Sequence, residues 1–145
     1  MGLDFGLRRI GLAISDRTGT IASAYGKVHG GKNAVLDVCK VIKAEEVQRL
    51  VIGLPLHMSG DHGDKAALAE EFGRSVQKLL PDLEILFEDE RLTTVSAQRI
   101  LLEGDLSRNK RKGVIDALAA TIILQKHLDR MERESKKLTN SLEKG

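Results

Sequence analysis

The chain has 145 residues, of which 41% are hydrophobic, so it has the length of one domain and enough apolar side chains for one core. This length excludes a two-domain enzyme. Aromatic residues make up only 3% and tryptophan is absent, which argues against binding nucleic-acid bases on aromatic platforms. The 23 Lys and Arg against 21 Asp and Glu give a net charge of +2, too small to identify a polyanionic partner without knowing where the charges lie.

The single cysteine and the lack of long apolar runs indicate the compartment. Cys39 cannot form an intramolecular disulfide or a cysteine-based zinc site, and its apolar helical neighbours predict a buried, reduced thiol. No apolar run approaches the ~18 residues that cross a bilayer, and the first residues lack a basic segment followed by an apolar one. We therefore expect a cytoplasmic protein that does not bind membranes.

The first third of the chain has the pattern of three antiparallel strands followed by a helix. Two apolar runs on either side of residues 6–9 predict a hairpin over residues 2–16, and alternation over residues 20–28 predicts a third strand. Apolar residues then recur at helical spacing from Asn33, a candidate N-cap, to about Val47.

The rest of the chain alternates between strands and helices. Continuous apolar runs predict buried strands at residues 50–54 and 83–87, separated by a polar loop over 57–64 and an amphipathic helix. Two further helices are expected, one over about residues 93–104 and a long one from residue 114.

This order of elements predicts an α/β fold. We expect one mixed five-stranded sheet, with three antiparallel strands followed by two parallel ones, flanked by helices. Residues 134–145 lose the helical period and are expected to fray, so the domain should span residues 1–133.

Acids stand at three places where a divalent cation could bind. Asp4 lies between apolar residues of the first strand, where an ionised acid is seldom buried without a partner. At the end of the fifth strand, alternation places Glu88 and Glu90 on one side and Asp89 on the other. Asp116 falls in the expected first turn of the last helix. Acids at strand ends and helix starts can hold the cations that phosphodiester hydrolysis needs, although a solvated strand end or a helix N-terminus would also explain them.

Basic residues flank two of these acids. Arg8 and Arg9 lie in the first hairpin near Asp4, and four more precede Asp116, namely Arg108, Lys110, Arg111 and Lys112. Such side chains can neutralise phosphates and position a strand without reading its sequence, whereas an ordinary solvated loop has the same composition.

Four motifs carry a family resemblance. They are Leu3-Asp4-Phe5-Gly6 with Arg9-Ile10-Gly11, Val51-Ile52-Gly53-Leu54-Pro55-Leu56 with Gly60, Asp89-Glu90-Arg91-Leu92-Thr93-Thr94, and Val114-Ile115-Asp116-Ala117. In this order and spacing, over about residues 2–128, they resemble the YqgF family. Its members are small RuvX-type proteins with a ribonuclease H-like fold, described as candidate Holliday junction resolvases and candidate nucleases for the 5′ end of pre-16S ribosomal RNA.

The resemblance implies a metal-dependent nuclease with a ribonuclease H-like sheet. Asp4, Glu90 and Asp116 would be its catalytic and metal-binding residues, holding two Mg²⁺ or Mn²⁺ ions. Spacing alone leaves open whether Glu90, Asp89 or Glu88 supplies the second carboxylate. Arg91, next to that acid, would form an ion pair or contact the nucleic acid together with the other basic residues.

The substrate is open at this point. The resemblance favours precursor ribosomal RNA over branched DNA, and a junction resolvase would need a homodimer to cut two strands, whereas an RNA-trimming enzyme could be a monomer. A non-catalytic ribosome assembly factor is a third reading, against which the three acids argue. The segment from Asp4 to Gly11 also resembles the phosphate-binding hairpin of actin-like and sugar kinases, but those sites close between two domains and need a longer chain.

Overall fold

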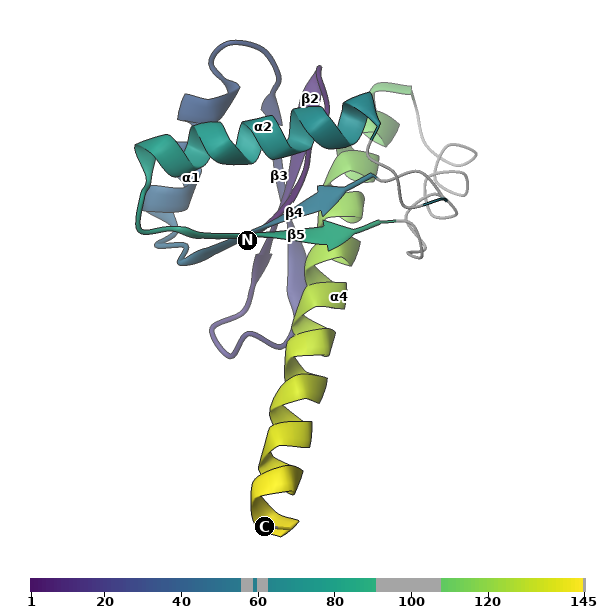
Figure 1. Ribbon diagram of the computed structural model, residues 1–145. Coiled ribbons are helices and arrows are strands. Elements are labelled where there is room, and N and C mark those ends of the chain that lie inside the picture. Colours follow the sequence, from purple (N-terminus) through teal and green to yellow (C-terminus); the bar gives the residue numbers. More distant parts are fainter. Residues whose placement is uncertain (56–58, 60–62, 91–107, 145) are drawn as a thin grey trace.

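A computed structural model of the chain describes residues 1–55, 59, 63–90 and 108–144, without the side chains of residues 108–116 and 144 (Figure 1). Its elements follow in the order β1 (Gly2–Asp4), β2 (Arg9–Ser15), β3 (Ala22–His29), α1 (Ala34–Ala44), β4 (Arg49–Leu54), α2 (Asp64–Leu79), β5 (Glu84–Asp89) and α4 (Arg108–Lys144). Within these residues, no helix is long and apolar enough to cross a membrane.

The five strands form one mixed sheet in the order β3-β2-β1-β4-β5. β1 pairs antiparallel with β2, and β2 with β3, while β4 pairs parallel with both β1 and β5. Three antiparallel strands followed by two parallel ones are the predicted arrangement, which is confirmed. Short turns can join only antiparallel neighbours, so the two helical crossovers make β4 and β5 parallel to β1.

Helices cover both faces of this sheet (Figure 1). α1 and α2 pack on one face, where the buried residues include Leu3, Ile10, Val38, Ile52 and Val76. α4 packs on the other face through a smaller cluster, made of Ala13, Val51, Ala120, Ile123 and Leu124. The two sides of the sheet therefore differ: one is a broad apolar core, and the other is crossed by a single helix.

α4 lies very close to β1 because the contact residues are small. A Cβ atom built on Gly2 would lie 2.6 Å from the carbonyl oxygen of Ala120 and 2.7 Å from the Cβ of Leu124. Any larger residue at position 2 would push the helix away from the sheet.

α4 is longer at both ends than the sequence pattern predicts. It begins at Arg108 rather than near Val114, so Asp116 lies in its third turn and not in its first. The four basic residues from Arg108 to Lys112 belong to its opening turns and not to a loop. Arg and Lys favour helices without adding an apolar period, so the pattern could not reveal these turns.

The end of α4 also differs from expectation. Residues 134–144, expected to fray, continue the helix, and their described side chains are exposed. Lys136 and Glu132 form a one-turn ion pair at 3.1 Å, which supports an exposed helix modestly. This part extends beyond the sheet in Figure 1. A domain boundary at residue 133 remains a proposal.

Tyr25 of β3 is 42% exposed and donates a hydrogen bond to Glu45 Oε1 at 2.9 Å. The expectation that β5 is buried on both faces is wrong, because β5 is an edge strand of the sheet and Phe87 is exposed on it. Edge position is a property of the topology, which the apolar run of β5 does not encode. The helix expected over residues 93–104 lies outside the described residues.

Cys39 is buried in α1, as predicted, and burial raises the pKa of its thiol. We therefore expect the native protein to react with a thiol reagent at pH 8 roughly 100-fold or more slowly than the unfolded chain, because reaction requires an opening of α1. Absorbance of the released chromophore, with and without denaturant, measures both rates. Equal rates would show that the packing of α1 against the sheet is wrong.

Candidate active site

Asp4 ends β1 and faces α4. Gly2 of the same strand lies against Ala120 and Leu124 of this helix, and side chains two residues apart share a face. Asp4 is only 8% exposed, and its strand neighbour on the other side is Gly11. An acid is therefore held in a nearly closed position beneath α4, which agrees with the prediction that Asp4 is more than a surface residue.

Glu90 reaches the same face from the other side of β4. A Cβ atom built on Gly53 would meet Glu90 Oε1 at 2.7 Å and also the side chain of Ile123 in α4. Because β1 and β4 pair Leu3 with Ile52, the next residues, Asp4 and Gly53, are neighbours at the carboxyl ends of these strands. The carboxylate of Glu90 thus occupies the space that the missing side chain of Gly53 leaves beside Asp4.

A backbone hydrogen bond fixes the position of Glu90 relative to β4. Its N–H donates to the carbonyl of Leu54 at 3.2 Å, so the β4–β5 ladder continues one residue beyond β5. Glu88 points to the same face as Glu90, as predicted, but its carboxylate is bound by α4. Asp89 alternates to the other face. Of the three acids, the structure therefore favours Glu90 as the partner of Asp4.

Asp116 lies in α4, the helix that covers both of these acids, but its side chain is outside the described residues. Among the side chains that are described, no three Asp, Glu, His or Cys residues come together closely enough to hold a metal ion. The convergence of all three predicted acids therefore stays a prediction.

A buried polar cluster, which the sequence pattern did not reveal, ties β5 to α4. Glu88 is 2% exposed and accepts a hydrogen bond from Arg130 at 2.8 Å, with the Nζ of Lys126 at 3.7 Å. Lys126 also donates to the carbonyl of Asp89 at 2.7 Å. These contacts hold the strand end that carries Glu90 against the helix that carries Asp116. The only signal in the sequence was the helical spacing of Lys126 and Arg130.

His127 completes this cluster. It is 1% exposed, and its Nδ1 lies 3.8 Å from Glu88 Oε2. In the described part of the chain its Nε2 has no hydrogen-bond partner. Burial lowers the pKa of His127 below 6.5, the charges of Arg130 and Arg49 lower it further, and Glu88 opposes them. The folded protein therefore favours the neutral imidazole.

The predicted nucleic-acid contacts fall into three groups. Arg8 and Arg9 lie at the β1–β2 turn, next to the end of β1 that carries Asp4, and Arg8 is exposed. The side chains of Arg108, Lys110, Arg111 and Lys112 are not described, although their backbone is helical. Arg91 lies outside the described residues.

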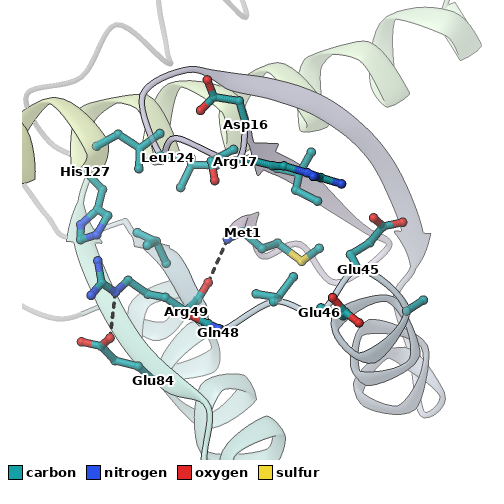
Figure 2. Close-up of a pocket in the computed structure, with 17 residues that line it drawn as sticks. Met1, Asp16, Arg17, Glu45, Glu46, Gln48, Arg49, Glu84, Leu124 and His127 are labelled. Carbon is teal, nitrogen blue, oxygen red and sulfur yellow. Dashed lines mark hydrogen bonds and ion pairs between the residues drawn. The ribbon is translucent and has the colours of Figure 1, made fainter.

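A cavity of about 1030 Å³ opens at the opposite end of the sheet. It is lined by the starts of β1, β4 and β5 and by the turn after β2, including Met1, Arg17, Arg49, Glu84 and His127 (Figure 2). Arg49 pairs with Glu84 at 2.8 Å, and the amino group of Met1 donates to the carbonyl of Arg49 at 2.9 Å. Sites in open α/β sheets form at the carboxyl ends of the parallel strands, so the candidate site is at Asp4 and Glu90 and not in this cavity.

Comparisons with known proteins show the family of this chain. A family model described as "RuvX: Holliday junction resolvase" matches residues 1–130. The chain belongs to the RuvX family. A relative from Limosilactobacillus reuteri is 42% identical over 143 residues, covering 95% of this chain and 97% of that protein. One from Endomicrobium trichonymphae is 44% identical over 133 residues, covering 89% and 94%. Both carry the name "Putative pre-16S rRNA nuclease".

The fold is that of RuvC. The chain matches the structure titled "T. thermophilus RuvC in complex with Holliday junction substrate" with a TM-score of 0.55 and 14% identity, over 90% of this chain and 93% of that one. A second Thermus thermophilus RuvC structure matches with a TM-score of 0.51. The ribonuclease H-like sheet expected for this RuvX chain is confirmed.

The packing of Glu90 over Gly53 predicts a coupling between the two positions. Gly53→Ala should destabilise the protein by about 1–3 kcal/mol because the added methyl displaces Glu90 and Ile123. Combined with Glu90→Ala, it should cost at least about 0.5 kcal/mol less than the sum of the single substitutions. Urea unfolding of the four proteins of the cycle measures this coupling.

Gly73→Ala is the matched control for this cycle. Its Cβ would crowd Phe87 and Ile52 on the other face of the sheet, at 3.0 and 3.1 Å, without meeting Glu90. Its effect should therefore add to that of Glu90→Ala. Additivity in the Gly53 cycle as well would contradict the described position of Glu90.

The lowered pKa of His127 predicts a pH-dependent stability. Below about pH 6.5 the unfolded chain binds a proton at His127 that the folded chain binds only at lower pH. The unfolded state then holds more protons, so the free energy of unfolding should fall as the pH decreases from 7 to 5. His127→Gln should reduce this fall in urea unfolding at several pH values, with His29→Gln, which changes an exposed histidine, as the control. An unchanged pH dependence in His127→Gln would overturn the assignment.

Proposed function

We propose that this RuvX-family chain is a metal-dependent nuclease that hydrolyses phosphodiester bonds in the 5′ extension of pre-16S ribosomal RNA. The observation that carries the proposal is the placement of Asp4 and Glu90. The two carboxylates lie on the same face at the carboxyl ends of β1 and β5, the strands on either side of β4, and Gly53 of β4 lies between them. Two buried carboxylates on one face are stabilised by positive charge, and a divalent cation bound by both would supply such charge.

The donor set fits a divalent cation. Asp4 is 8% exposed and the Oε1 of Glu90 is buried, so both acids present carboxylate oxygens in a water-poor position, and Mg²⁺ and Mn²⁺ prefer such ligands. Asp4, Glu90 and Asp116 would hold two ions, which supply charge stabilisation for the attacking and leaving oxygens when bound. The protein itself would fix the two strand-borne carboxylates through the β-ladder and the contacts of Glu88, so that little reorganisation precedes the reaction.

Ribosomal RNA is the favoured substrate. The relatives at 42–44% identity span nearly the whole chain and carry a pre-16S rRNA nuclease name, whereas the likeness to RuvC at 14% identity concerns the fold. Branched DNA is the alternative, because the family model is described as a Holliday junction resolvase. A resolvase would act as a homodimer on two strands, whereas trimming one RNA strand requires only a monomer.

Asp4→Asn tests the site. The amide keeps the shape of the side chain but removes the negative charge that a cation needs, so cleavage should fall by at least about 100-fold. The metal-free fold should be equally or more stable, because the substitution removes repulsion with Glu90. Cleavage of a 5′-extended 16S precursor and of a four-way DNA junction, side by side with Mg²⁺ or Mn²⁺, measures activity and substrate choice.

Asp82→Asn is the control for this experiment. Asp82 is exposed just before β5, at the other end of the sheet, so its substitution should leave cleavage unchanged. Full activity of Asp4→Asn would exclude Asp4 as a ligand. Cleavage of the junction alone would replace RNA by branched DNA as the substrate.

A further inference from the structure

Basic side chains gather at one end of the β2–β3 hairpin. Residues 5–15 and 22–36 contain no Asp or Glu, and their basic residues are Arg8, Arg9, Lys27, His29 and Lys32, which we call the hairpin patch. The antiparallel register pairs Arg9 with His29 and Gly11 with Lys27. The N–H of Gly30 donates to the carbonyl of Arg8 at 2.8 Å, which ties the β1–β2 turn to the end of β3. Residues far apart in the sequence thus form one surface.

Four of the five residues of the hairpin patch are exposed to solvent. These four are Arg8, Lys27, His29 and Lys32, and β3 is one of the two edge strands of the sheet. Within the described part of the chain, none of these four side chains forms an ion pair. Positive charge is therefore concentrated here on a protein whose net charge is only +2.

The register also connects the hairpin patch to Asp4. Gly11 pairs with Asp4 on one side and with Lys27 on the other, so the three residues lie in one row across the sheet. Lys27 and Asp4 are two strand spacings apart, about 10 Å, and share a face by alternation. Gly11 places no side chain between them. A strand whose phosphate reaches Asp4 would therefore pass over Lys27.

We propose that the hairpin patch binds the phosphodiester backbone of the substrate strand next to the cleavage site, with Lys27 as its central phosphate contact. This inference rests on the proposed nuclease function and adds Lys27, His29 and Lys32, which lie outside the four family motifs, to its residues. Lys and Arg side chains recognise the charge of phosphates and not the bases, so the hairpin patch would position the strand without selecting its sequence. Phosphodiester chemistry is common to RNA and DNA, and the experiment separates the two.

The affinity for a labelled single-stranded RNA, measured against salt concentration with EDTA present, tests the proposal. Lys27→Ala should weaken binding about 3- to 10-fold at low salt and make the log–log salt slope about 0.7 less steep, because one phosphate contact is lost. Lys27→Arg should retain both affinity and slope. In cleavage assays, Lys27→Ala should raise KM more than it lowers kcat.

Arg17→Ala is the matched control, because Arg17 is an exposed cation at the other end of the same hairpin. It should leave affinity and slope unchanged. Single-stranded DNA of the same sequence and a four-way junction form the other arms. If the protein binds RNA more tightly than DNA, the hairpin patch binds an RNA strand, as expected for a ribosomal substrate. If it binds DNA more tightly, the patch binds a DNA strand.

Two results would overturn the proposal. One is a double variant, Lys27→Ala with His29→Ala, whose RNA affinity and salt slope equal those of the wild type. The other is a loss of affinity in Arg17→Ala as large as that in Lys27→Ala. Failure of this proposal can be distinguished from failure of the nuclease function. If the wild type cleaves the substrate and Lys27→Ala leaves the salt slope unchanged, only the role of the hairpin patch is rejected. If Lys27→Ala changes the salt slope but the wild type does not cleave, the hairpin patch binds nucleic acid and the nuclease function is rejected.

Discussion

The close contact between α4 and the sheet is the constraint on which the rest of this structure depends. Gly2 lies directly against the backbone of Ala120, and Gly53 lies beneath Ile123, so at these two positions the strands place no side chain under the helix. Interiors are packed as densely as organic crystals, and such a contact tolerates little added volume. The distance from α4 to β1 and β4 is therefore set by residues that have no side chain.

This contact also positions the acids. Gly53, which lies under Ile123 of α4, also leaves room near the carboxyl end of β4 beside Asp4, and Glu90 fills part of that room. Glu88, Lys126 and Arg130 fasten β5 to the helix one turn further along α4. A buried carboxylate with a charge-assisted hydrogen bond contributes more to a defined geometry than to net stability, because desolvation offsets much of the attraction. We infer that the contacts of Glu88 with Lys126 and Arg130 orient the end of β5 that leads to Glu90.

Charge is divided between the two ends of the sheet. At the candidate site the acids Asp4 and Glu90 lie on one face of the sheet together with strands β2 and β3, which contain no acid and carry the exposed Lys27 and His29. At the opposite end, the cavity is lined by both basic and acidic side chains, and Arg49 forms an ion pair with Glu84. A nearly neutral chain can thus present one surface that attracts a polyanion, since the field near a surface depends on local and not on net charge.

Several features of this protein followed from its sequence alone. Period-two and continuous apolar runs predicted the strands and their mixed pairing, because burial on one or both faces leaves a direct trace in the residue pattern. Asp4 stood out since an acid in an apolar strand needs a partner, and the family motifs connected it with Glu90 and Asp116. The buried state of Cys39 followed from its helical neighbours.

Only the tertiary structure decided the remaining features. The opening turns of α4 have no apolar period, the edge position of β5 depends on strand order, and the exposure of Tyr25 depends on what lies beside β3. Glu88 and Arg130 are 42 residues apart, and Lys27 lies in the row of Asp4 only through two strand pairings. Periodicity records whether a side chain is buried, but it does not record which distant side chain it meets. That choice is made when register and packing bring separate segments together.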